Sequence, residues 1–175
     1  MGAGKTTLGR HLARKLQLDF YDLDWYVEHR YRMKIPKIFE ERGESGFREI
    51  ERNMLHEVAE FEDIVLSCGG GTPCFFDNMD YMNSQAETFY LKAEPAVLKA
   101  HLLMGKSVRP LIQGKTPDQL LDFINTSLAQ REAYYNQARH IININVIHTE
   151  EQIDEYVRQI ITSIKTQRHN EKMAH

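Results

Sequence analysis

Cysteine is scarce in this sequence of 175 residues, which contains only Cys68 and Cys74. Two cysteines cannot form the disulfide framework of a small secreted domain, and their spacing differs from that of zinc ligands. Long apolar runs are also missing, because no stretch approaches the roughly 18 residues of a membrane span. The N-terminus lacks the apolar core of a signal peptide. We therefore expect a protein of the reducing cytoplasm that does not bind membranes.

An excess of basic residues is absent as well. The chain has 22 Lys and Arg against 25 Asp and Glu, which gives a formal net charge of −3, and no basic stripe is evident. Nucleic acid is therefore not an expected partner. The composition, 42% hydrophobic and 27% charged, is that of an ordinary soluble globule. We expect a monomer with one domain at residues 1–165 and a polar C-terminal tail at 166–175.

Hydrophobic periodicity predicts an alternation of helices and strands. Helices are expected at residues 5–16, 25–34, 37–43, 44–58, 95–104, 118–137 and 150–164, and strands at 18–24, 63–67, 87–93 and 140–147. The stretch at 105–117, GKSVRPLIQGKTP, has the composition and length of a functional loop. Strands that alternate with helices imply a parallel sheet covered by helices on both faces.

The N-terminal residues MGAGKTT contain the end of the phosphate-binding pattern G-x-x-x-x-G-K-[ST]. Glycines let backbone N–H groups approach a phosphate chain, and the N-terminus of the following helix adds its dipole. Lys5 would reach the terminal phosphates, and the Thr6 hydroxyl would bind Mg²⁺. The ATP-binding residues expected here are Gly2, Ala3, Gly4, Lys5, Thr6 and Thr7.

Two other interpretations of this segment stay open. The glycines could form a flexible N-terminus in front of an amphipathic helix. Residues 1–6 also match the myristoylation pattern M-G-x-x-x-[ST], which is looser than the combination of glycines, lysine and tandem threonines. Phosphate binding is the interpretation that accounts for all of these residues together.

Two carboxylates, Asp22 and Asp24, end the strand expected at 18–24. Alternation along a strand places both on one face, at the C-terminal edge where parallel α/β sheets bind ligands. One carboxylate would help to hold hydrated Mg²⁺, and the other would accept a hydroxyl proton. The alternative is a pair of N-cap residues that begins the next helix.

Arg48 and Glu51 lie three residues apart on one side of the helix expected at 44–58, so they can form a local ion pair. Such a pair by itself indicates a solvated helix face more than a site. Three consecutive glycines, Gly69–Gly71, lose much conformational entropy on folding. Their presence suggests that a ligand closely approaches their backbone N–H groups.

Two more arginines are candidates. Arg109 lies in the loop expected at 105–117, which is the placement of a lid arginine that stabilises charge on a transferring phosphoryl group. Arg131 lies beside Glu132 on the helix that follows, where a salt-bridged surface arginine is the simplest interpretation.

Together these segments resemble the shikimate kinase family, along the chain from Met1 to about residue 165. The matching segments are MGAGKTTLGR, DLD, GESGFREIE, CGGGTP, VRPLI and REAYY. The resemblance implies a three-layer α/β P-loop kinase fold, like that of nucleoside monophosphate kinases, with a parallel sheet in the strand order 2-3-1-4-5. It also implies transfer of the γ-phosphoryl group of MgATP to the 3-hydroxyl of shikimate, in the biosynthesis of aromatic amino acids through chorismate.

The resemblance assigns roles position by position. Asp22 supports Mg²⁺, and Asp24 is the candidate base that also binds the shikimate hydroxyls. Arg48 and Arg131 form a clamp for the substrate carboxylate. The implied catalytic residues are Asp24, Lys5 and Arg109, the substrate-binding residues are Asp24, Arg48, Gly70 and Arg131, the lid contact to ATP is Arg109, and the metal residues are Thr6 and, through water, Asp22.

Two features depart from the family pattern. Many members carry an arginine pair that packs on adenine, where this chain has His101 and Leu102, so Lys106 or the loop at 147–151 would have to hold the adenine. The buried strand that normally precedes the phosphate loop is missing, and in the order 2-3-1-4-5 it is the central strand. We expect the natural chain to continue for about ten residues before Met1, as an apolar strand that ends in Gly-x.

Two other functions stay open. One is another small-metabolite kinase of the same fold, such as a gluconate kinase. The other is a nucleotide-binding module without catalysis. Release of ADP that depends on shikimate would distinguish the expected kinase from both.

Overall fold

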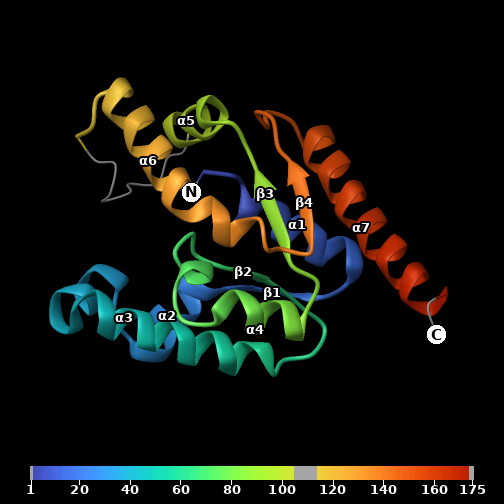
Figure 1. Cartoon of the computed structure of the whole chain (residues 1–175), viewed down its shortest axis with the longest axis horizontal. Coiled ribbons are helices and arrows are strands. Elements are labelled where there is room, and N and C mark those ends of the chain that lie inside the picture. Colours follow the sequence, from blue (N-terminus) through green and yellow to red (C-terminus); the bar gives the residue numbers. More distant parts are fainter. Residues whose placement is uncertain (1, 105–113, 174–175) are drawn as a thin grey trace. The chain divides into compact units, whose positions relative to one another are not determined.

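The computed structural model describes residues 2–104 and 114–173, and for residues 168–172 the backbone alone. Helices and strands alternate along the chain, as the sequence predicts (Figure 1). The elements are α1 (Lys5–Leu16), β1 (Asp19–Asp22), α2 (Leu23–Tyr31), α3 (Ile35–Ala59), β2 (Ile64–Ser67), η1 (Thr72–Cys74), α4 (Asn78–Gln85), β3 (Phe89–Lys92), α5 (Pro95–Met104), α6 (Pro117–Tyr135), β4 (His140–Asn143) and α7 (Glu150–Met173). None of the described helices is long and apolar enough to cross a membrane.

The described residues form two compact units, and each unit contains one two-stranded parallel sheet. In the unit Lys5–Ala86, β1 pairs with β2. In the unit that combines residues 2–4 with those from 87 onward, β3 pairs with β4. The two pairs agree with the neighbours 2-3 and 4-5 of the expected strand order. The complete order, the three layers and the single-domain boundary stay predictions.

The core of the unit Lys5–Ala86 forms where α2 packs against α3. Each apolar side chain buried there contributes roughly 1.5–3 kcal/mol. Helix α1 contacts both strands of this unit and presents one buried face, as its periodicity predicts. The buried residues of the core cluster are Leu23, Val27, Ile38, Phe47, Ile50, Met54 and Leu55, and those of α1 are Leu8, Leu12 and Ala13.

Helix α3 consists of two helical segments that meet at Gly43, where the sequence predicts a break. Gly43 has φ 65° and ψ −176°, so its backbone is not helical. Pro36 lies in the first turn of the first segment, where its missing N–H removes no helical hydrogen bond. The second segment places Arg48 and Glu51 among its buried residues.

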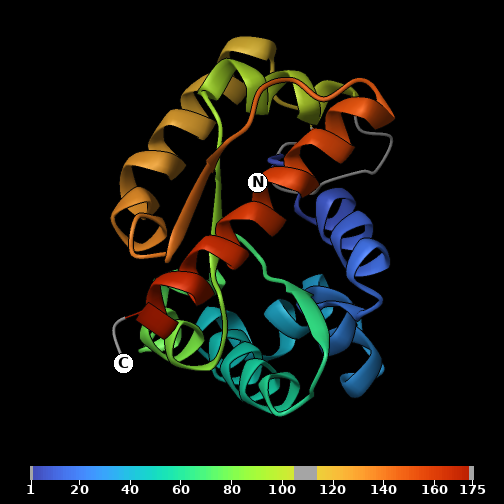
Figure 2. The ribbon, with the colours of Figure 1, turned by 90° about the vertical axis from the view of Figure 1, so that its right-hand side faces the viewer.

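In the second unit, α5 and α6 lie side by side in both views (Figure 1 and Figure 2). They bury Leu98 and Leu102 from α5, and Leu120 and Ile124 from α6. A capping box begins α6, because the Thr116 hydroxyl accepts from the Gln119 N–H while the Gln119 side chain accepts from the Thr116 N–H. Helix α7 contacts β4.

Helices α4 and α7 differ from the sequence predictions. The periodicity does not predict α4, because its sequence NMDYMNSQ has no clear apolar face. Helix α7 continues to Met173, although the sequence predicts a frayed tail after residue 164. The extension is physically reasonable, because the segment after Ile164 contains helix-forming Lys, Gln, Arg and Glu and no proline or glycine.

Candidate active site

The N-terminal glycines adopt the geometry of an anion-binding nest. Gly2 and Gly4 have positive φ angles of 77° and 79°, whereas Ala3 between them does not. This alternation turns successive N–H groups toward one side of the backbone. Helix α1 begins directly afterwards at Lys5, and its first N–H groups have no partner within the helix. The conformation suits a phosphate-binding loop, and ATP binding by these residues stays a prediction.

Asp22 uses its two carboxylate oxygens for two different contacts. Its Oδ2 atom accepts a hydrogen bond from the Thr6 hydroxyl at 3.0 Å. Its Oδ1 atom accepts from the N–H groups of Asp24 at 3.2 Å and Trp25 at 3.5 Å, which makes Asp22 the N-cap of α2. The N-cap interpretation is therefore correct for Asp22, and the same side chain also contacts the candidate metal ligand Thr6.

Asp24 lies in the first turn of α2 and not on a strand, so the expected strand alternation of Asp22 and Asp24 is wrong. The strand ends at Asp22 because this residue caps the helix. Burial and the neighbouring carboxylates of Asp22 and Glu51 raise the pKa of Asp24 from the ordinary 3.8 to about 6. The Lys5 ammonium acts in the opposite direction and lowers this pKa. Asp24 is a carboxylate that can exchange a proton near neutral pH.

Arg48 and Glu51 form a buried ion pair, so their interpretation as a solvated helix face is wrong. Only 9% of Arg48 and 1% of Glu51 is exposed. Nη1 of Arg48 donates to Glu51 Oε2 at 2.8 Å, and Nη2 donates to Glu44 Oε1 at 3.3 Å. The guanidinium carbon lies 4.1 Å from the centre of the Phe75 ring. Since a guanidinium has five N–H donors, Arg48 keeps donors for a further anion.

The triple glycine forms a turn that touches these charged groups. A Cβ atom on Gly69 would lie 3.1 Å from Asp24 Oδ1, and one on Gly71 would lie 2.6 Å from Arg48 Nη1. The carbonyl of Gly70 accepts from the Cys74 thiol at 3.8 Å. Glycine is needed at the last position because a side chain there would displace the Arg48 guanidinium. The close approach seen in the structure is that of the chain's own side chains, and approach of a ligand stays a prediction.

Thr72 and Asn78 hold this turn, although the sequence predicts a role for neither. The Thr72 hydroxyl donates to Glu51 Oε1 at 2.7 Å, and Asn78 Nδ2 donates to the carbonyl of Thr72 at 2.8 Å. Both side chains are fully buried. A threonine after glycines and an asparagine at a helix start are common, so no local sequence signal would have identified this chain of contacts from Asn78 to Arg48.

The remaining predicted site residues are less well defined by their contacts. Arg131 is partly buried on α6, and its side chain forms no hydrogen bond or ion pair with the residues that the structure describes. Its neighbour Glu132 pairs with Lys92 at 2.6 Å, so the simple surface salt bridge expected of Arg131 is not seen. Thr7 is exposed on α1. Arg109, Lys106 and the first nine residues of the expected lid (105–113) lie outside the described residues.

His101 and Leu102, which stand near the family's adenine-packing arginines, instead contact the N-terminal glycine loop. Nδ1 of His101 lies 2.8 Å from the carbonyl oxygen of Gly2. Leu102 is buried, and its Cγ atom would lie 3.1 Å from a Cβ atom on Gly2. Leu102 therefore packs under the loop, and its contacts give no surface for a nucleotide base.

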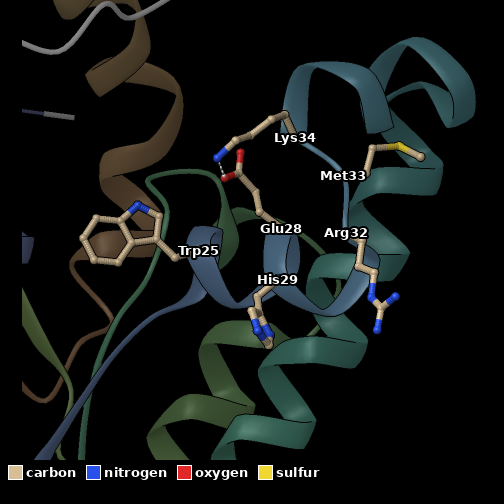
Figure 3. A pocket seen from close by; sticks show the side chains of 6 residues that line it. All are labelled: Trp25, Glu28, His29, Arg32, Met33 and Lys34. Carbon is tan, nitrogen blue, oxygen red and sulfur yellow. Dashed lines mark hydrogen bonds and ion pairs between the residues drawn. The ribbon is translucent and has the colours of Figure 1, made fainter.

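A surface pocket of about 370 Å³ lies on α2 and the turn after it (Figure 3). Its lining residues are Trp25, Glu28, His29, Arg32, Met33 and Lys34. Figure 3 shows that Glu28 and Lys34 point toward each other, with 2.6 Å between Oε2 and Nζ, while Trp25 and Arg32 extend in different directions. The polar groups do not converge on one point, and no predicted site residue lines this pocket. We therefore do not place the active site there.

Among the side chains that the structure describes, in residues 2–104, 114–167 and 173, no group of three or more His, Cys, Asp and Glu is arranged to hold a metal ion. Thr6 and Asp22 offer one hydroxyl and one carboxylate, whose oxygens lie 3.0 Å apart. Such hard oxygen donors suit Mg²⁺, which is usually held by few protein ligands together with water and substrate phosphates.

The chain is similar to shikimate kinases in sequence. The family profile described as "Shikimate kinase" matches residues 1–165. A shikimate kinase from Bacteroides thetaiotaomicron is 51% identical over 160 residues, which cover 91% of this chain and 91% of that protein.

The chain is also similar to shikimate kinases in structure. A crystal structure of shikimate kinase from Bacteroides thetaiotaomicron superposes with a TM-score of 0.92 at 50% identity, over 94% of each chain. A shikimate kinase from Acinetobacter baumannii, solved in complex with shikimate, superposes with a TM-score of 0.79 at 32% identity, over 95% of this chain and 89% of that one. The predicted α/β P-loop kinase fold is thereby confirmed.

Proposed function

This chain belongs to the shikimate kinase family, and we propose that it transfers the γ-phosphoryl group of ATP to the 3-hydroxyl of shikimate. The observation that supports the proposal most directly is the turn at Gly69–Gly71, which lies against both Asp24 and Arg48. The reaction needs a carboxylate that takes the hydroxyl proton and a cation that binds the substrate carboxylate. One turn brings these two groups together.

The proposed step breaks the bond between the γ-phosphorus and its bridging oxygen, which leaves with ADP. A new bond forms between that phosphorus and the 3-oxygen of shikimate, and the hydroxyl proton passes to Asp24. With its pKa raised by burial to about 6, Asp24 is largely ionised at neutral pH and is basic enough to accept this proton. Positioning and charge neutralisation supply most of the rate enhancement in such transfers.

The substrate is bound through its carboxylate by Arg48 and Arg131, and the Gly70 N–H donates to it. The buried pair with Glu51 holds the Arg48 guanidinium in one orientation, so that little rotamer entropy is lost when the anion binds. Arg109 approaches the ATP phosphates from the lid, an assignment that depends on the family pattern alone.

The nucleotide is bound at residues 2–7, where the backbone N–H groups and Lys5 face the phosphates. Thr6 and Asp22 would hold Mg²⁺, Thr6 through its hydroxyl and Asp22 through a water molecule, because both offer hard oxygen donors at 3.0 Å from each other. Bound Mg²⁺ would supply positive charge that neutralises the β- and γ-phosphates.

A coupled assay of ADP release against a panel of hydroxy acids tests the proposal. We expect ADP release with shikimate and none above background with gluconate or with shikimate that lacks its 3-hydroxyl. Turnover with gluconate would favour a different metabolite kinase. Binding of MgATP without ADP release on any member of the panel would favour a nucleotide-binding module.

We also propose that the enzyme is a cytoplasmic monomer that serves aromatic amino acid biosynthesis. The absence of a disulfide framework in the sequence supports the cytoplasmic location, and the match to the shikimate kinase family supports the biosynthetic role. Light scattering of the purified chain checks the monomer, since a dimer would double the measured mass.

A further inference from the structure

His101 lies on α5, in the unit that contains residues 2–4 and those from 87 onward. Its Nδ1 atom is 2.8 Å from the carbonyl oxygen of Gly2. Its Nε2 atom is 2.9 Å from the backbone nitrogen of Ile147, in the loop between β4 and α7. One side chain thus joins two backbone segments that are far apart in the sequence.

These two contacts determine which imidazole nitrogen carries the hydrogen. The Ile147 N–H can only donate, so Nε2 must be the unprotonated nitrogen that accepts. Nδ1 therefore carries the hydrogen and donates it to the Gly2 carbonyl, which can only accept. Neutral His101 satisfies both backbone groups, and no other tautomer does.

The bond to Gly2 orients an N–H group of the nest. The carbonyl of Gly2 and the N–H of Ala3 belong to one planar trans peptide, so they point in opposite directions. Holding the carbonyl toward His101 therefore holds the Ala3 N–H on the opposite side, between the two positive-φ glycines. Gly2 already lies close to α5, because a Cβ atom on it would be 3.1 Å from the carbonyl oxygen of Leu98.

The bond to Ile147 holds a second segment beside the same loop. The Ile147 Cδ1 atom would lie 3.6 Å from a Cβ atom on Gly4, which is ordinary van der Waals contact. The loop at 144–149 thus touches the glycine loop through the Ile147 side chain and is tied to α5 through the Ile147 N–H. His101 connects both loops to one helix.

We propose that His101 is a positioning residue for ATP. Through the Gly2 carbonyl it orients the Ala3 N–H toward the phosphates, and through the Ile147 N–H it holds the loop at 144–149 beside them. The inference rests on the proposed function, because it takes the glycine loop to be the ATP site. Loss of His101 then weakens the binding of ATP and leaves the binding of shikimate unchanged.

Two substitutions separate the two hydrogen bonds. In His101→Asn the side-chain amide can take the place of Nδ1 and donate to Gly2, but it does not reach the Ile147 N–H. In His101→Gln the side-chain oxygen can take the place of Nε2 and accept from Ile147, but no donor remains at Gly2. His101→Leu removes both bonds. His29→Asn, at an exposed histidine on α2, is the matched control.

The full chain and each variant are titrated with MgATP and, separately, with shikimate, and amide hydrogen exchange at Ile147 is measured by NMR without ligand. We expect the Asn and Gln variants to raise the Kd for ATP about tenfold each and the Leu variant about a hundredfold. The Kd for shikimate should stay within about twofold of the wild-type value. Exchange at Ile147 should accelerate in the Asn and Leu variants and stay near wild type in the Gln variant.

Three results would overturn the proposal. The first is a folded Leu variant that binds ATP as tightly as the wild type. The second is an equal loss of affinity for ATP and shikimate, which would indicate general loosening of the structure. The third is unchanged exchange at Ile147 in the Asn variant. A wild-type chain that binds no ATP would instead defeat the proposed function, and exchange at Ile147 would still show whether the bridge exists.

Discussion

Among the single residues, Asp24 has the most direct consequence for activity. Asp24→Asn keeps the shape of the side chain but cannot accept a proton, so turnover should fall roughly 10²–10⁴-fold. In the wild-type chain, turnover should rise with pH through about 6, where Asp24 loses its proton. Steady-state kinetics over this pH range provide the measurement. Near-normal turnover of the variant would mean that Asp24 only positions the substrate.

The raised pKa of Asp24 also predicts how the free energy of unfolding depends on pH. Burial raises the pKa of Asp24 from 3.8 to about 6, so the folded chain binds this proton more tightly than the unfolded chain. The contribution is fully present below the unfolded pKa and is lost as the pH rises through the folded pKa. The free energy of unfolding of Asp24→Asn relative to the wild type should therefore increase over this window and then level off. Urea unfolding at a series of pH values checks this, and a difference independent of pH would contradict it.

Thr72 links the glycine turn to the buried ion pair. Thr72→Val leaves Glu51 Oε1 without the hydroxyl at 2.7 Å, and a buried acceptor without a partner costs about 1–3 kcal/mol. Because Glu51 holds Arg48, the variant should also bind shikimate less tightly. Denaturant unfolding and shikimate titration measure the two effects. Thr72→Ser, which keeps the hydroxyl, is the control and should retain most of the affinity.

At the scale of elements, the junction of β1 and α2 carries two roles that one substitution can separate. Asp22 caps α2 with Oδ1 and contacts Thr6 with Oδ2. Asparagine is as good an N-cap as aspartate, so Asp22→Asn should change the free energy of unfolding little, whereas Asp22→Ala should lower it by about 0.5–2 kcal/mol. Both variants should need more Mg²⁺ for half-maximal activity. Equal Mg²⁺ requirements in the wild type and the Asn variant would exclude Asp22 from the metal site.

The same junction shows why some element boundaries could not be predicted. The sequence FYDLDWY alternates like a strand as far as Asp24. However, the Asp22 side chain accepts hydrogen bonds from two N–H groups, and the helix begins at Leu23, two residues before the predicted start at residue 25. Local alternation cannot indicate which aspartate acts as the cap. Where the signal is strong the prediction holds, as for α5, whose bounds Pro95–Met104 are the predicted ones.

At the scale of the whole molecule, the sequence predicts the family and its chemistry better than it predicts the buried contacts that hold the site residues in place. The segments that resemble the family place Arg48 and Asp24 among the candidates because their residue types recur in a recognisable order. The burial of the Arg48–Glu51 pair depends on tertiary packing of α3 against the glycine turn, which no local pattern contains. The same holds for Thr72, since its role depends on a partner 21 residues earlier in the chain.

Ligand binding should be visible in the stability of the entire chain. A ligand that binds only the folded state stabilises it by about 2.7 kcal/mol at roughly 100 times its Kd. MgATP should therefore raise the Tm of the chain, and removal of Mg²⁺ with EDTA should cancel most of this increase. Differential scanning fluorimetry measures both. An equal Tm increase with and without EDTA would contradict a role for Mg²⁺ in nucleotide binding.

The two sulfur atoms on either side of the glycine turn offer a chemical probe of the site. Neither Cys68 nor Cys74 is in a disulfide, and burial raises the pKa of the Cys68 thiol to about 12, so its reactive thiolate is almost absent at neutral pH. Cys74 lies 3.8 Å from the Gly70 carbonyl.

An alkylating reagent should therefore modify Cys74 first, and shikimate should slow that modification, as followed by peptide mass spectrometry. Faster labelling of Cys68 would contradict this order. Because both cysteines are part of the natural sequence, occupancy of the turn can be followed by alkylation without any substitution.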